Sequence, residues 1–106
     1  MNWIALTDYS QIQKALDQSE PFLVFKHSTR CSISSMALSR FERIFCLEAV
    51  KAFYLDLIVY RSISNQLAEE FSVKHQSPQL LFIQNGSCTY NASHNSIDLS
   101  RIKTLL

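Results

Sequence analysis

The sequence predicts an α/β fold in which a mixed sheet of about five strands is sandwiched between helices. Three observations support this prediction. Short runs that are apolar at every position alternate with longer segments of helical period, which is typical of strands covered by helices on both faces. Asn85-Gly86 lies between two strand-like segments and is a strong hairpin signal. Finally, 106 residues with 47% hydrophobic content suit one packed domain, residues 1–106.

The first half of the chain predicts two strands, each followed by a helix. The strands are the short apolar run Trp3–Leu6, at an edge of the sheet, and Phe22–Phe25, which is expected to be buried on both faces. The helices are residues 7–17 and Ser32–Leu47, where apolar residues recur at the helical period. The residues Lys26–Cys31, which connect the second strand to its helix, are polar and predict a loop.

The second half predicts a further strand and helix, then a hairpin and a last helix. Ala52–Leu57 and Gln79–Gln84 are the strands, and Ser87–Asn91 returns beside the second of them as its antiparallel partner. Helices are expected over residues 62–71, with Ser62 or Ser64 as the cap, and over residues 95–106. Because strands and helices alternate, the strands should pair in parallel with right-handed crossovers, and the hairpin makes one end of the sheet antiparallel. This order of elements is that of the thioredoxin-like architecture.

Composition and charge exclude several classes of protein. Ten basic and nine acidic residues are spread evenly and leave a net charge of +1, so neither nucleic acid nor an anionic membrane surface is an expected partner. No apolar run approaches the ~20 residues that span a bilayer, and the N-terminal residues lack the features of a signal peptide, which together predict a cytoplasmic protein. No pair of Cys or His residues has the spacing of metal ligands, so neither a metal site nor a tightly bound cofactor is expected.

One of the three cysteines, Cys31, is the candidate catalytic nucleophile. An odd number of cysteines favours reduced thiols over a disulfide framework. Cys31 lies where a buried strand is followed by a helix, and a sulfur at a helix N-terminus is close to unpaired backbone N–H groups and the positive end of the helix dipole. Both favour the nucleophilic thiolate, and Arg30 adds a positive neighbour. The alternative is a buried, inert cysteine.

Ser34 and the Ser77-Pro78 pair complete the candidate site. Ser34 occupies the position at which a dithiol C-x-x-C motif has its second cysteine. Serine cannot form a disulfide, so its expected role is a hydrogen bond to the Cys31 thiolate, and the sulfur must exchange with an external thiol. Proline cannot donate to a strand ladder, so we expect a cis Ser77-Pro78 bond beside the Cys31 helix, with the Ser77 backbone free to pair with an extended substrate. The simpler alternatives are a first-turn serine and a trans proline.

Four stretches of the chain match one known family in order. They are Phe25–Ser34, Tyr60–Asn65, His75–Gln79 and Ala92–His94, and with Trp3-Ile4 and Leu6-Thr7 they cover nearly the whole chain. On these residues the sequence resembles the YtxJ-type monothiol bacilliredoxins, thioredoxin-like proteins of the bacillithiol system. Such colinearity is far more specific than a single C-x-x-S motif. The resemblance implies a thioredoxin fold, with Cys31 as the only catalytic thiol and Pro78 as the cis-proline.

The resemblance also implies the reaction and its partners. The implied activity is that of a thiol–disulfide oxidoreductase that removes bacillithiol from mixed disulfides on S-thiolated cytosolic proteins, with bacillithiol or another low-molecular-weight thiol as co-substrate. Cys31 then carries the bacillithiol until a free thiol restores it. The family usually has proline where this chain has Ser32. Serine returns a backbone N–H that can reach the sulfur, so the thiolate should be more stable but a weaker nucleophile, which affects the rate and redox poise more than the reaction type.

Basic residues near the sulfur are candidates for binding the carboxylates of the malate group in bacillithiol. Arg30, Lys74 and His75 are expected to bind them through charge-assisted hydrogen bonds, if these side chains converge. The alternative is a solvated basic rim. The substrate-binding set that the sequence predicts is Arg30, Ser32, His75, Ser77 and Pro78.

The remaining histidines and cysteines are expected to be structural. A role for His27 as a base, or in orienting the loop, is one hypothesis. The simpler expectation is a structural histidine whose ring nitrogens are hydrogen bonded to the backbone. His94 should cap or pin the last loop, and Cys46 and Cys88 should be small packing residues.

Two other functions remain open from the sequence. One is a non-catalytic thioredoxin-like protein-binding module, which the missing second cysteine and Ser32 both allow. It predicts partner binding that survives Cys31→Ser. The other is a monothiol glutaredoxin-like enzyme that uses glutathione or another low-molecular-weight thiol. The oligomeric state is left open.

Overall fold

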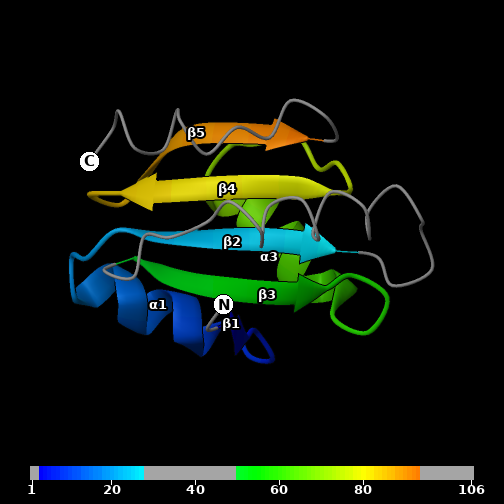
Figure 1. The fold of residues 1–106 in the computed structure, drawn as a ribbon, viewed down its shortest axis with the longest axis horizontal. Coiled ribbons are helices and arrows are strands. Elements are labelled where there is room, and N and C mark those ends of the chain that lie inside the picture. The colour runs from blue at the N-terminus through cyan, green and yellow to red at the C-terminus, as the bar shows by residue number, and fades with distance from the viewer. Residues whose placement is uncertain (1–2, 28–49, 94–106) are drawn as a thin grey trace.

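The structure, a computed structural model, describes residues 3–27 and 50–93. These residues form a five-stranded mixed sheet, in the order β1-β3-β2-β4-β5, and two helices (Figure 1). The strands are β1 (Trp3–Ala5), β2 (Phe22–His27), β3 (Lys51–Asp56), β4 (Gln79–Gln84) and β5 (Ser87–Ser93), and the helices are α1 (Ser10–Asp17) and α3 (Arg61–Glu70). The helices predicted over Ser32–Leu47 and 95–106 lie outside the described residues. The prediction of an α/β fold with a mixed sheet of five strands is confirmed.

The direction of β4 differs from the prediction. β1 and β2 both pair with β3 in parallel, as the alternation of strands and helices predicts, but β4 pairs with β2 in the antiparallel direction. Gln79 at the start of β4 lies opposite Lys26, so the chain enters β4 at the edge where β2 leaves the sheet. Alternation determines which elements follow one another, whereas the connection after α3, residues 71–78, determines at which edge the next strand begins. The antiparallel part of the sheet therefore contains β4 as well as β5.

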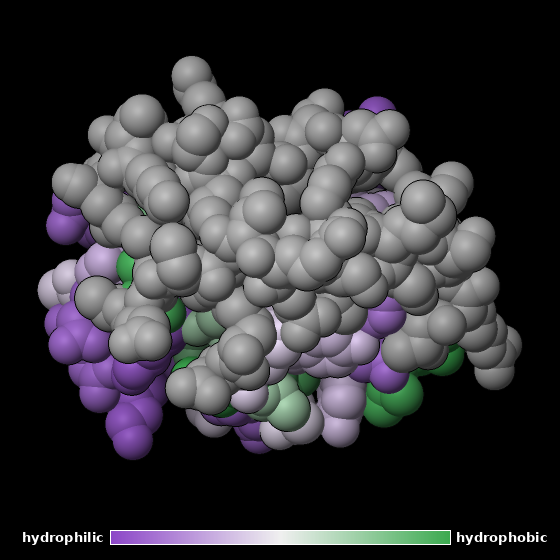
Figure 2. Space-filling view, in the orientation of Figure 1, coloured by the Kyte–Doolittle hydropathy of each residue, from purple (hydrophilic) through white to green (hydrophobic). Residues whose placement is uncertain are grey.

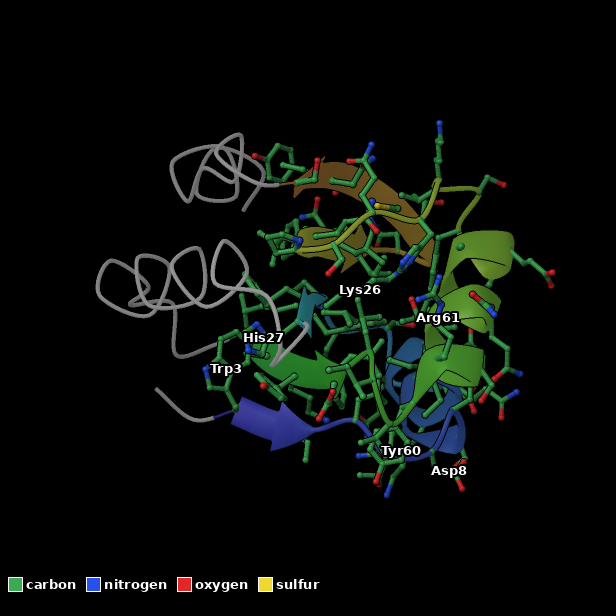
Figure 3. All side chains as sticks on the ribbon, turned by 90° about the vertical axis from the view of Figure 1, so that its right-hand side faces the viewer. Trp3, Asp8, Lys26, His27, Tyr60 and Arg61 are labelled. Carbon is green, nitrogen blue, oxygen red and sulfur yellow. The ribbon has the colours of Figure 1, made fainter. Side chains whose placement is uncertain are left out.

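Side chains of β2 alternate between two hydrophobic clusters. Phe22 and Val24 pack with apolar residues of α1 and α3, whereas Leu23 and Phe25 belong to a second cluster on the opposite face. Figure 3 shows both helices on one side of the sheet. This alternation determines toward which face each later residue of β2 points.

β2 continues through two residues that the sequence predicts to be part of a polar loop. Lys26 and His27 pair with Leu55 and Asp56 of β3, and their side chains are only 0% and 4% exposed. The prediction of a loop from Lys26 was wrong because it followed from the polarity of these side chains. Backbone pairing is what extends the strand, with β3 on one side and with Gln79 of β4 on the other.

α3 begins without the serine cap that the sequence offers. Its first residue is Arg61, and Tyr60 at the N-cap position makes no side-chain cap hydrogen bond. Ser62 and Ser64 are plausible caps by sequence, but both lie inside the helix, and Ser64 is fully buried. The Ser64 hydroxyl is therefore available for another contact. Neither α1 nor α3, the helices of the described residues, is long and apolar enough to cross a membrane.

The hairpin at Asn85-Gly86 is confirmed. Both residues have positive φ, 52° and 78°, as a two-residue turn between twisted strands requires. β5 then pairs with β4 in the antiparallel direction as far as Ser93, slightly beyond the predicted end at Asn91.

Candidate active site

Three strands meet at the edge of the sheet where the candidate site is expected. β2 and β3 end there, and β4 begins there with Gln79 opposite Lys26. The bond between Ser77 and Pro78, immediately before β4, is cis, as the sequence predicts. The cis-proline therefore lies beside the end of the strand that precedes Cys31 in the sequence.

The structure describes one part of the predicted site. The nucleophile and its neighbours, Arg30, Cys31, Ser32 and Ser34, lie outside the described residues, whereas His75, Ser77 and Pro78 lie within them. Pro78 is buried and Ser77 is half-buried, and the Ser77 Oγ atom is shielded from solvent without a hydrogen-bond partner. An unpaired buried hydroxyl is unfavourable by about 1–3 kcal/mol, so this side chain does not stabilise the fold through its polar group.

Gln79 holds the loop that leads to the cis-proline. Its side chain is 1% exposed. The Nε2 atom donates a hydrogen bond to the carbonyl of Lys74 at 2.9 Å, and the Oε1 atom accepts one from the N–H of Gln76 at 3.4 Å. One buried side chain thus satisfies two backbone groups of the loop, which stabilises the approach to Pro78.

His75 lies in the same loop and is anchored to α3. Its Nδ1 atom is hydrogen bonded to the Ser64 hydroxyl at 3.0 Å. Burial lowers the pKa of His75 below its ordinary value of 6.5, and the positive charges of Lys26 and Arg61 lower it further. His75 is therefore mostly neutral at pH 7, so it offers a ligand a hydrogen bond rather than the charge that the sequence suggests.

Lys26 is a buried cation that the sequence does not single out. Its Nζ atom lies 3.4 Å from the carbonyl oxygen of Ser64 in α3. Burial lowers the pKa of Lys26 to about 8, and the positive charge of Arg61 contributes to this shift. The sequence did contain a signal. Lys26 follows Phe22 and Val24 at alternate positions, so a strand that continues to it must direct its side chain toward the α3 face.

His27 points to the opposite face, where it lies among aromatic rings. Its ring centroid is 5.5 Å from that of Tyr54 and 6.5 Å from that of Phe25, in tilted arrangements. The Trp3 ring makes edge contacts with the same two rings, at 6.1 Å and 6.0 Å. Figure 3 shows Trp3 and His27 on the side of the sheet away from α3, and Lys26 on the side of α3. These contacts support the structural role expected for His27.

An exposed apolar pair follows β3 at the same edge of the sheet. Ile58 and Val59 are 42% and 65% exposed, and Figure 2 shows hydrophobic surface at the lower right, where this loop lies in Figure 1. The N–H of Leu57 donates to the carbonyl of His27 at 2.9 Å, which holds the start of the loop against the end of β2.

Cys88 on β5 is the packing residue that the sequence predicts. It is half-buried against the hydrophobic cluster on the α3 face, and its Sγ atom donates to the carbonyl of Tyr90 at 3.3 Å. Burial raises the pKa of the Cys88 thiol, which disfavours the reactive thiolate. Cys46 and His94 lie outside the described residues. Within residues 3–27 and 50–93, no three His, Cys, Asp or Glu side chains are close enough together to hold a metal ion.

Comparison with known proteins gives both the fold and the family. The family model of the monothiol bacilliredoxins matches residues 4–102. A solved thioredoxin-fold protein, proposed to be an oxidoreductase, is 28% identical, with a TM-score of 0.84 over 96% of this chain and 91% of that one. Trxlp of Edwardsiella tarda is 15% identical, with a TM-score of 0.72 over 99% of this chain and 98% of its own. Thioredoxin of Trypanosoma brucei brucei is 12% identical, with a TM-score of 0.73 over 98% of this chain and 88% of its own. The last two show the fold, and the match to the family model shows that the chain belongs to the monothiol bacilliredoxin family of thiol oxidoreductases.

Proposed function

We propose that this protein removes bacillithiol from mixed disulfides on cytosolic proteins, with Cys31 as its only catalytic thiol. The observation that carries the proposal is the cis Ser77-Pro78 bond beside the end of β2. Cys31 follows the last residue of β2, His27, by four positions in the sequence. The proposal requires Cys31 to lie near this edge, and the four residues that separate it from the end of β2 span at most about 14 Å. A thiol and a cis-proline at one edge together offer a sulfur and a backbone segment to a disulfide substrate.

The proposed reaction is thiol–disulfide exchange. The Cys31 thiolate attacks the bacillithiol sulfur of the mixed disulfide, a new S–S bond forms between Cys31 and bacillithiol, and the old S–S bond breaks. The electron pair of the broken bond leaves with the protein thiolate. A second low-molecular-weight thiolate then attacks the bacillithiol sulfur, which releases the Cys31 thiolate and a small-molecule disulfide. Ser34 has no sulfur to exchange, and its proposed role is to donate a hydrogen bond to the Cys31 thiolate.

The residues around the sulfur are proposed to bind the two parts of the substrate. The Ser77 backbone pairs with the extended protein segment next to the disulfide. Arg30 and the exposed Lys74 supply positive charge for the malate carboxylates. His75 contributes a hydrogen bond, since burial keeps it neutral. The N–H of Ser32 is proposed to stabilise the sulfur anion.

Mass spectrometry of the reduced protein, mixed with a bacillithiolated protein substrate, tests this proposal. Bacillithiol should move from the substrate to Cys31, where peptide mapping locates it, and Cys31→Ser should accept none. Cys88→Ser is the matched control, because it removes a thiol that burial disfavours as a thiolate, and it should react at the wild-type rate. Equal transfer by Cys31→Ser, or no transfer by the wild type, would contradict the proposal. Transfer from a glutathionylated substrate alone would change the identity of the small thiol.

A further inference from the structure

A chain of buried polar groups connects β2, α3 and the loop that ends at the cis-proline. The Nζ atom of Lys26 contacts the Ser64 carbonyl oxygen at 3.4 Å, and the Ser64 hydroxyl is hydrogen bonded to Nδ1 of His75 at 3.0 Å. Lys26 and Ser64 are both 0% exposed. His75 lies two positions before Ser77 in the sequence, so the polar chain ends at the loop that carries Ser77.

We propose that Lys26 is a positioning residue for this loop: through Ser64 and His75 it holds residues 74–78 in the conformation that presents the Ser77 backbone to the substrate. The inference rests on the proposed function, because it concerns the substrate-binding loop of that site. It requires no contact between Lys26 and the substrate, and the complete burial of Lys26 prevents one.

The register of β2 and β4 places Lys26 next to this loop. Lys26 and Gln79 lie opposite one another in the antiparallel pair, so both side chains point to the same face of the sheet. Gln79 holds the loop at Lys74 and Gln76, with hydrogen bonds of 2.9 Å and 3.4 Å. The polar chain from Lys26 holds it at His75, between these two. Lys74, His75 and Gln76 are therefore each held by a polar group of a buried side chain.

Packing alone does not explain a charged residue here. The earlier β2 residues on the same face are apolar, and an apolar side chain at this position would avoid the desolvation of an ammonium group. The charged or titratable groups that interact with Lys26 are Arg61, which disfavours its charge, Cys88, which favours it, and His75, whose own pKa Lys26 lowers. Within residues 3–27 and 50–93, the ammonium group contacts the Ser64 carbonyl, in the residue that anchors His75. The burial of this charge is unfavourable by itself, but the contact that it makes lies in the residue that anchors the loop.

Lys26→Met tests this role, because it removes the charge and keeps most of the side-chain length. We expect a folded protein in which amide hydrogen exchange of residues 74–79 is faster by about tenfold, as when one supporting hydrogen bond is lost. The KM for a bacillithiolated protein substrate should rise about five- to tenfold, with kcat within about twofold. Alkylation of the Cys31 thiol by iodoacetamide should stay within about twofold of wild type, because the change acts on the loop and not on the sulfur.

Two further variants make the test decisive. Lys51→Met is the matched control, since Lys51 is a half-buried lysine at the start of β3 whose Nζ atom donates to Gln18, and it should change none of these quantities. Ser64→Ala removes the hydroxyl that binds His75 and leaves the backbone carbonyl, so it should change exchange and KM in the same direction as Lys26→Met. If Lys26→Met does not fold, Ser64→Ala decides the question.

Several outcomes overturn the inference. The first is unchanged amide exchange of residues 74–79, and the second is faster exchange with an unchanged KM. The third is alkylation of Cys31 that slows in parallel with transfer, because it would mean that the substitution acts on the sulfur. If the wild type transfers no bacillithiol, the proposed function fails by itself. The exchange of residues 74–79 then still decides whether Lys26 holds the loop.

Discussion

The two parts of β2 are almost equally buried but contribute differently to the protein. Phe22–Phe25 are 0–1% exposed, and their side chains enter both hydrophobic clusters. Lys26 and His27, at 0% and 4% exposure, instead contact a helix carbonyl and aromatic rings. Burial of apolar area favours folding by roughly 25 cal/mol per Å², whereas burial of an ammonium group opposes it. The chemistry of the buried group, rather than the extent of burial, separates the part that stabilises the sheet from the part that supports the site.

Removing an aromatic ring from the apolar part should have the largest effect on stability. Phe22→Ala leaves a cavity beside Phe53, whose ring lies edge-on at 5.7 Å, and should lower the free energy of unfolding by about 3–5 kcal/mol. Urea denaturation followed by circular dichroism measures this change. Ile4→Ala, at a 38% exposed position of the edge strand β1, is the control and should change stability by less than about 1 kcal/mol. Similar losses in both variants would mean that buried Phe22 contributes no more to stability than an exposed residue of the edge strand.

The apolar part is also the part that the sequence predicts well, because its signals are local. Phe22–Phe25 are apolar at four successive positions, which indicates a strand buried on both faces. Asn85 and Gly86 carry the positive φ that their own turn requires. In each case the physical cause lies within a few neighbouring residues.

The polar part could not be predicted in the same way, because its burial depends on residues distant in sequence. Lys26 is buried where Gln79 and Leu55 complete the ladder on its two sides and α3 lies against its ammonium group. Ser64 has the sequence of a helix cap and yet lies in the core. The direction of β4, which brings Gln79 to Lys26, also depends on the course of the chain after α3. The roles of Cys31 and its neighbours stay predictions.

Replacing Lys26 should affect stability with the opposite sign. Lys26→Met should raise the free energy of unfolding at pH 7 by about 1–3 kcal/mol, because an apolar side chain replaces a buried cation for which the described residues supply no carboxylate partner. The same variant is expected to loosen the loop, so global stability and local order should change in opposite directions. Urea denaturation of Lys26→Met, with Lys51→Met as the control, measures the change in the free energy of unfolding. A variant less stable than wild type would show that the ammonium group stabilises the fold.

The difference between wild type and Lys26→Met should also depend on pH. Burial sets the pKa of folded Lys26 at about 8, below the 10.5 of an ordinary lysine. Between these two values the unfolded chain binds the proton more strongly than the folded one, so wild-type stability rises with pH relative to the variant. The slope should reach at most about 1.4 kcal/mol per pH unit, and below pH 8 the full penalty of the buried charge is present. Denaturation at pH 7, 8, 9 and 10 should show the gap closing; a constant gap would mean that Lys26 keeps its ordinary pKa.

The smallest expected effect concerns the imidazole of His75. Burial lowers its pKa, and Lys26 and Arg61 add to the shift, so Lys26→Met should move the pKa part of the way back toward 6.5. Arg61→Met should move it in the same direction. NMR titration of the imidazole nitrogens measures both. Because the folded pKa lies below the unfolded one, His75 reduces stability as pH falls below 6.5, and the variants should weaken this dependence. An unchanged pKa in both variants would mean that burial alone keeps His75 neutral. Lys26 and the loop would then not be coupled through charge, and the contacts of Ser64 would be what connects them.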